Sequence, residues 1–136
     1  MNIQMFAKQE IALRQIDTAL ELFSRQGDLF SVITLAGAAE EILGQLLEQR
    51  SGKVGLRGLL GSIFQVLRPG RRTGDEQEGL SGHETDDFVH LDPHHEAVFL
   101  LGRAIADYVE LSGAPSASML EFLSEVTLHS GSGRLP

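Results

Sequence analysis

The segment that decides the fold reads LFSVITLAGAAEEILGQLLEQ, from Leu29 to Gln49. Its apolar residues recur at about 100° per residue, which predicts a helix with one broad buried face. That face comprises Val32, Leu35, Ala36, Ala39, Ile42, Leu43 and Leu46, and Phe30 and Ile33 extend it. A helix that is apolar on more than one side is typically central, and the small residues at 36–39 allow a neighbouring backbone to approach closely. We therefore predict that this helix is the hub of a helical bundle.

Towards the N-terminus, apolar residues recur at helical spacing from about residue 6 to residue 26. Gly27 is expected to end this helix, and the carboxylate of Asp28 is expected to cap the helix that follows. Because the link between the two helices is so short, they should run antiparallel.

Towards the C-terminus the spacing predicts three more helices, at about 54–67, 93–111 and 118–129. Asp92 and Pro93 form a strong helix start, since aspartate caps and proline has a fixed φ. Ser118 and Glu121 have the spacing of a capping box that opens the last helix, whose candidates for the inward face are Leu120 and Leu123, with Phe122 and Val126 as further candidates. No strand pattern stands out, so the predicted class is all-α, a compact antiparallel bundle of four to five helices.

A length of 136 residues fits a single helical domain over residues 1–136. Residues 68–92 interrupt it with a long loop that is rich in glycine and acidic residues. Loops beyond about 12–15 residues are usually functional or disordered, and this composition favours disorder. The tail from about residue 130 is also expected to be loose.

The composition argues against several classes of partner and of chemistry. A formal net charge of −8 repels phosphate, so nucleic acid is an unlikely partner. The absence of cysteine excludes disulfides, thiolate nucleophiles and Cys-ligated zinc. The sequence shows neither a signal peptide nor a stretch of about 18 uncharged residues, which predicts a cytoplasmic protein with no membrane partner.

Histidines cluster before and at the start of the fourth expected helix. His83, His90, His94 and His95 lie among acidic residues, and imidazole and carboxylate groups are ligands for divalent metals. We predict that His94 could meet Glu40 of the hub helix, with His90 and Asp92 near it, in a metal or small-ligand site. The alternative, which we favour, is that His94 is a half-buried histidine of the first helical turn and that the others are solvated.

Two aromatic residues lie outside the expected buried stripes. Phe30 and Phe99 are therefore candidates for the contact face of a homodimer. The fingerprints of phosphate-binding loops, hydrolase nucleophiles, zinc proteases and EF-hands are all missing, which argues against an enzyme. The leading hypothesis is a non-catalytic interaction protein that contacts a second copy of itself or an unknown protein partner.

Three stretches carry a resemblance to a group of small bacterial helical proteins of uncharacterised function. They are Ile16-Asp17-Thr18-Ala19-Leu20 with Gly27-Asp28, Thr34 to Leu43, and Phe88-Val89-His90-Leu91-Asp92-Pro93. The resemblance spans about Ile11 to Phe122. In that group the loop before the fourth helix often carries Asn-x-x-x-His, which is similar to the Arg-x4-6-His element of HEPN-type ribonucleases and toxin–antitoxin partners.

In this chain the histidine of that element would be His83. Gly79 stands at the asparagine position and Glu78 precedes it, and no arginine lies five to seven residues ahead of any histidine. An arginine that stabilises phosphate charge and a histidine that moves a proton would both be needed for RNA cleavage. The resemblance therefore implies a HEPN-like fold and, as a further alternative function, a degenerate HEPN-type RNA-processing or toxin–antitoxin protein.

Overall fold

The computed structural model describes residues 1–51 and 87–132. The chain divides into two compact units, one made of Met1–Leu47 with Pro93–Pro136 and the other of Glu48–Asp92. The single domain predicted over 1–136 stays a prediction.

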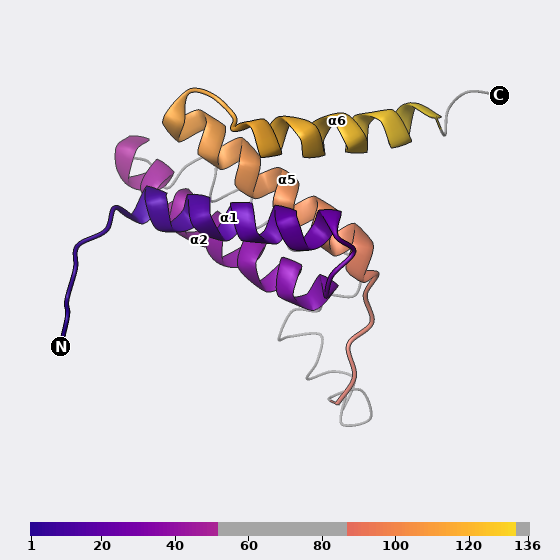
Figure 1. The fold of residues 1–136 in the computed structure, drawn as a ribbon, viewed down its shortest axis with the longest axis horizontal. Coiled ribbons are helices and arrows are strands. Elements are labelled where there is room, and N and C mark those ends of the chain that lie inside the picture. Colours follow the sequence, from indigo (N-terminus) through magenta and orange to yellow (C-terminus); the bar gives the residue numbers. More distant parts are fainter. Residues whose placement is uncertain (52–86, 133–136) are drawn as a thin grey trace, which may run out of the picture. The chain divides into compact units, whose positions relative to one another are not determined.

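The described residues contain four helices and no strand, which confirms the all-α class for this part of the chain (Figure 1). The helices are α1 (Lys8–Ser24), α2 (Leu29–Ser51), α5 (Pro93–Ser112) and α6 (Ala117–Ser132). All four lie within three residues of the predicted bounds, and α6 continues beyond the predicted end at 129. The predicted helix at 54–67 and most of the loop at 68–92 lie outside the described residues.

The turn from α1 to α2 follows a pattern of helix ends in which one residue adopts a left-handed conformation. That residue is Gln26, with a φ of 57°, which directly precedes Gly27, the residue predicted to end the helix. The N–H of Gln26 donates to the carbonyl of Phe23 at 3.1 Å, and the N–H of Gly27 donates to the carbonyl of Leu22 at 2.7 Å. A Cβ on Gly27 would stand 3.1 Å from that carbonyl oxygen, a tight contact that glycine avoids.

Asp28 caps α2, as the sequence predicts. Its carboxylate accepts a hydrogen bond from the backbone N–H of Ser31 at 3.1 Å and another from the Ser31 hydroxyl at 2.7 Å. The hydroxyl is the main cause, ahead of the backbone bonds, of a lowered pKa for Asp28. The chain then reverses, and α1 and α2 run in opposite directions (Figure 1).

The core of the first unit is rich in alanine. Six alanines are fully buried, two from each of three helices: Ala12 and Ala19, Ala36 and Ala39, and Ala97 and Ala104. Larger side chains fill the space between them, chiefly Ile16, Val32, Leu43, Leu101, Ile105 and Met119. A Cβ on Gly37 would lie 3.9 Å from a methyl group of Leu100, so α2 approaches α5 at the predicted small residues. Short side chains let these backbones pack closely.

The inward face of α6 differs from the prediction. Ser116, not Ser118, begins the helix, because the Ser116 hydroxyl accepts the N–H of Met119 at 3.3 Å. Met119 is fully buried, whereas Leu120 and Leu123, predicted to face inward, are 53% and 37% exposed. Phe122, a further candidate for the inward face, is buried, and Val126 is partly buried against the core.

By length and composition alone, Leu29–Arg50 is the one described segment that could cross a membrane. A core helix satisfies the same two criteria, and Val32, Ala36, Ala39 and Leu43 of this segment are fully buried. The expected cytoplasmic location stays a prediction.

Candidate functional site

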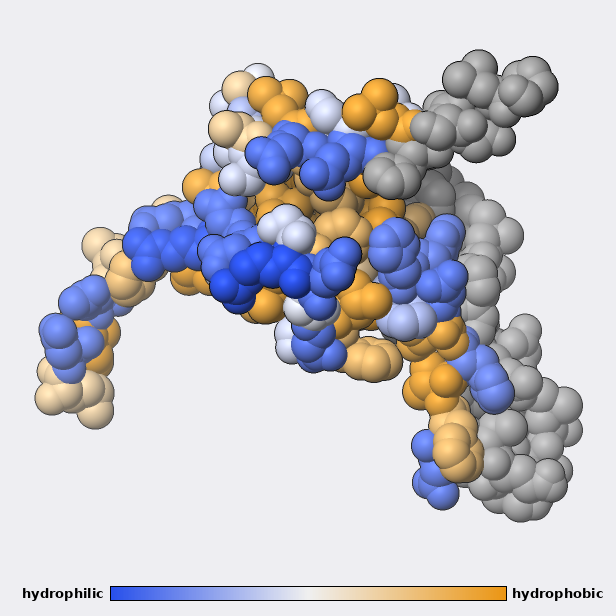
Figure 2. All heavy atoms as spheres, turned by 45° about the vertical axis from the view of Figure 1, so that its right-hand side comes forward, coloured by the Kyte–Doolittle hydropathy of each residue, from blue (hydrophilic) through white to orange (hydrophobic). Residues whose placement is uncertain are grey.

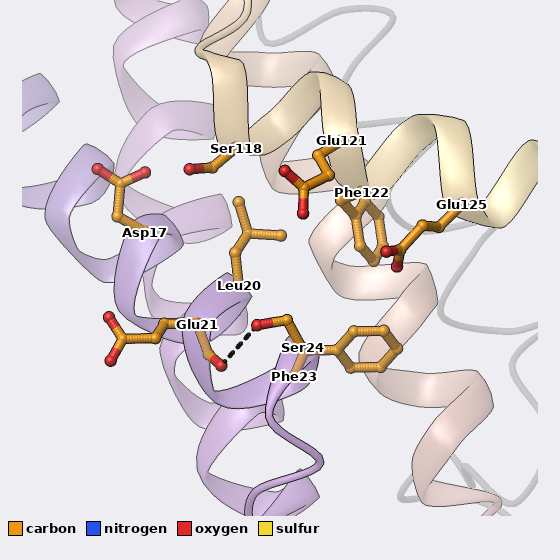
Figure 3. Close-up of a pocket in the computed structure, with 9 residues that line it drawn as sticks. All are labelled: Asp17, Leu20, Glu21, Phe23, Ser24, Ser118, Glu121, Phe122 and Glu125. Carbon is orange, nitrogen blue, oxygen red and sulfur yellow. Dashed lines mark hydrogen bonds between the residues drawn. The ribbon is translucent and has the colours of Figure 1, made fainter.

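A groove of about 370 Å³ opens between α1 and α6 (Figure 3). We call it the α1–α6 groove, and its lining residues are Asp17, Leu20, Glu21, Phe23, Ser24, Ser118, Glu121, Phe122 and Glu125. Leu20 and Phe122 are buried and form its floor together with the half-buried Phe23. The rings of Phe23 and Phe122 meet edge to face, with their centroids 5.6 Å apart.

Four carboxylates stand on the rim of the α1–α6 groove. Asp17 and Glu21 lie one turn apart on α1, and Glu121 and Glu125 lie one turn apart on α6. None of the nine lining residues is basic. In Figure 2 the apolar floor, in orange, separates the hydrophilic side chains of α6 from those of α1, in blue. The groove is therefore apolar inside and acidic at its edges.

Local contacts hold the rim on α1. The Ser24 hydroxyl donates to the backbone carbonyl of Glu21 at 3.0 Å, shown as a dashed line in Figure 3. Arg25, just outside the groove, stands 3.7 Å from the Glu21 carboxylate, and both side chains are exposed. An exposed pair at this distance contributes little to stability.

Asp17 differs electrostatically from an ordinary surface carboxylate. Partial burial removes water from its carboxyl group and raises its pKa above the usual value. Its negative charge is therefore less well solvated than that of a free carboxylate. A cation that entered the groove would offset this cost.

The α1–α6 groove combines acidic and aromatic side chains. Within the described ranges, no three histidine, aspartate or glutamate side chains lie where they could hold a metal ion. The Ser24 hydroxyl is engaged with a backbone carbonyl and not with a base that could activate it. Carboxylates around an aromatic floor are suited to a ligand with a cationic head and an apolar stem.

Glu40 and His94, the predicted site pair, have other neighbours. The Glu40 carboxylate lies 3.2 Å from the guanidinium of Arg103, and the His94 ring lies 5.4 Å from the ring of Phe23. Arg103 follows His94 by nine residues, a rise of about 13 Å along a helix. The structure therefore pairs Glu40 with Arg103 and places His94, in the first turn of α5, against the ring of Phe23.

The remaining predicted ligands do not belong to the described part of the first unit. His90 and Asp92 are exposed and belong to the second unit, where residues 87–92 precede α5 without helical structure. His83, the HEPN-like position, lies outside the described residues. The metal site and the HEPN-type activity both stay predictions.

The two predicted contact aromatics differ in exposure. Phe30 is 60% exposed on the first turn of α2. Phe99 is partly buried, packs against the core and lies under the guanidinium of Arg103 at 5.9 Å. Phe30 therefore has enough exposed ring surface to contact a second copy, whereas most of the Phe99 side chain is buried against its own chain.

A second apolar surface escaped the sequence analysis. Residues 1–7 are not helical, and Met1, Ile3 and Met5 are 82% to 112% exposed. Next to them a hollow of about 300 Å³ is lined by Phe6, Glu10, Ile11, Arg14, Gln15, Thr18 and Leu35. The alternation of apolar and polar residues at positions 1–5 was the available signal for an extended segment.

No family model, curated protein or solved structure matches this chain. The proposals below consequently rest on the geometry of the described residues.

Proposed function

We propose that this protein is a non-catalytic interaction protein that forms a homodimer, built as a compact antiparallel bundle of four to five helices. The observation that carries the proposal is the apolar N-terminal arm, residues 1–7, beside the hollow lined by Phe6, Ile11 and Leu35. Figure 1 shows this arm leaving the start of α1 and running away from the helices. Apolar side chains exposed in this way are typical of segments that pack against a partner.

The arm has the form of a segment that binds in an extended conformation. Met1, Ile3 and Met5 alternate with polar residues, so an extended chain places them on one side. Phe6 lines the hollow of its own chain, so residues 1–5 are the part of the arm that can cross, with a reach of about 17 Å when extended. In a two-fold dimer Met1, Ile3 and Met5 of each copy would occupy the hollow of the other, and each contact would form twice.

The hollow offers the surface that such an arm needs. Phe6 and Ile11 are 48% and 39% exposed, and Leu35 is half-buried between α1 and the solvent. At one edge of the hollow the guanidinium of Arg14 lies 5.9 Å over the Phe6 ring and 2.9 Å from the Glu10 carboxylate. Phe30 adds exposed apolar surface on α2.

Sedimentation equilibrium tests the proposal. The wild-type chain is expected to be dimeric at micromolar concentration, and the double variant Ile3→Asp and Met5→Asp is expected to be monomeric. Leu120→Asp with Leu123→Asp is the matched control, since it adds the same two charges to exposed apolar positions of α6. A wild-type monomer, or a dimer that only the α6 variant disrupts, would refute dimerisation through the arm.

A further inference from the structure

The chain uses one combination of three side chains twice. Arg14 lies 5.9 Å over the ring of Phe6 and 2.9 Å from the carboxylate of Glu10. Arg103 lies 5.9 Å over the ring of Phe99 and 3.2 Å from the carboxylate of Glu40. In both places an arginine stacks on a phenylalanine while a glutamate neutralises its charge. The guanidinium group suits this arrangement because it is planar and weakly hydrated, so its face can stack on a ring while its N–H groups donate hydrogen bonds to a carboxylate.

The α1–α6 groove contains two of these three components. Phe23 and Phe122 supply the aromatic surface, and Asp17 and Glu121 supply carboxylates from opposite rims. The third component does not line the groove, because its nine lining residues include no arginine or lysine. The groove thus presents an aromatic and acidic setting that a cation from outside would complete.

We propose that the α1–α6 groove is a docking site for an arginine side chain carried by a segment of a partner protein. The methylene stem of the arginine would lie on the floor of Leu20, Phe23 and Phe122, and its guanidinium would meet the rim carboxylates. The volume of about 370 Å³ is at the small end of ligand pockets and accommodates one or two side chains rather than a whole helix. Residues flanking the arginine would rest on the rim.

Two simpler cations fit the groove less well. A metal ion needs convergent ligands, and the described part of the chain brings no three acidic or histidine side chains into such a group. A polyamine would satisfy the carboxylates, but its strongly hydrated ammonium groups would gain little from two phenylalanine rings. The apolar floor is what selects a guanidinium with an alkyl stem.

This docking site is separate from the surface proposed for the homodimer. No residue lines both surfaces, although they lie next to each other on α1, where Asp17 lines the groove and Thr18 lines the hollow. The two proposals can therefore fail independently, because sedimentation measures one and peptide binding measures the other.

The first test uses an end-blocked fluorescent peptide, Gly-Leu-Arg-Leu-Arg-Leu-Gly, and fluorescence anisotropy with the full-length protein at low ionic strength. Saturable binding is expected. A peptide with lysine in place of arginine, and spermine as a competitor, should each bind at least about tenfold more weakly, a difference of about 1.4 kcal/mol. Equal binding of the lysine peptide or of spermine would refute the arginine site, and so would the absence of saturable binding.

The second test separates the groove from the general negative charge of the protein. Asp17→Asn with Glu121→Gln removes two charges from the rim, and Glu41→Gln with Glu110→Gln removes two charges from exposed positions of α2 and α5 outside the groove. The rim variant should weaken arginine-peptide binding about tenfold or more, and the control about threefold or less. Equal losses of affinity in both variants would show that peptide binding depends only on the net charge of the protein, and would refute the site.

A third variant addresses the aromatic floor. Phe23→Leu retains an apolar side chain of similar size but removes a ring. Cation–π stacking predicts that the preference for the arginine peptide over the lysine peptide falls in this variant, while circular dichroism and the melting temperature confirm folding. An unchanged preference would refute stacking on Phe23.

Discussion

The guanidinium of Arg103 lies 3.2 Å from the carboxylate of Glu40 and joins α5 to α2. The two side chains are only 24% and 17% exposed, so water screens the pair less than it screens an ordinary surface pair. Glu40→Gln and Arg103→Met should each lower the free energy of unfolding by about 1–3 kcal/mol. Urea unfolding of both single variants and the double variant gives the coupling energy. Strictly additive losses would show that the pair contributes nothing as a pair.

The left-handed Gln26 offers a stabilising substitution. A φ of 57° strains a residue that has a Cβ, so Gln26→Gly should raise the free energy of unfolding by about 1 kcal/mol. Gly27→Ala should have the opposite effect, since its new Cβ would crowd the side chain and carbonyl of Leu22. Thermal unfolding followed by circular dichroism measures both. A lower melting temperature for Gln26→Gly would contradict the turn described above.

Asp28 should make stability depend on pH. Its pKa is lowered in the folded state, so its contribution is present above the unfolded value near 3.8 and is lost as pH falls through the lower folded value. Asp28→Ala should therefore be less stable than the wild type at pH 7, and the difference should shrink below pH 4. Melting temperatures between pH 7 and pH 2.5 test this. A constant difference over that range would mean that the carboxylate charge has no role in the cap.

Asp17 should show the opposite dependence. Burial raises its folded pKa, so the neutral carboxyl is favoured on folding and this contribution is lost as pH rises through the folded value. Asp17→Asn should slightly stabilise the unbound protein at pH 7, with no gain below pH 3.5. The effect is small because the side chain is largely exposed. NMR titration of the Asp17 carboxyl carbon measures the pKa directly, and a value below 3.8 would overturn the prediction.

Much of the described fold could be predicted because helix spacing and caps are local signals. Pro93 starts α5, Asp28 caps α2 and Gly113 follows the end of α5 with a φ of 95°, each as the residue type suggests. The inward face of α6 was harder to predict, because its apolar residues spread around much of the helix and tertiary packing decides which of them are buried: Met119, Leu120, Phe122, Leu123 and Val126.

The candidate site was harder to foresee than the fold. The α1–α6 groove joins residues 17–24 to residues 118–125, and no local pattern relates segments so far apart in the sequence. Glu40 could be placed near the edge of its helix, but which cation of α5 it meets depends on how the helices cross. The histidines suggested a site because they are clustered along the sequence. Asp17 and Glu121 are far apart in the sequence, and only the packing of α1 against α6 brings them to the same groove.

The alanines of the core have a mechanical consequence. Alanine has no side-chain rotamers, so the spacing at Ala12, Ala19, Ala36, Ala39, Ala97 and Ala104 cannot adjust by rotation about a χ angle. At these six positions the distance between helices is therefore set by contacts of the methyl groups, which cannot adapt by changing rotamer. Replacing one of these alanines with a larger residue would therefore have to displace a helix backbone and not only a neighbouring side chain.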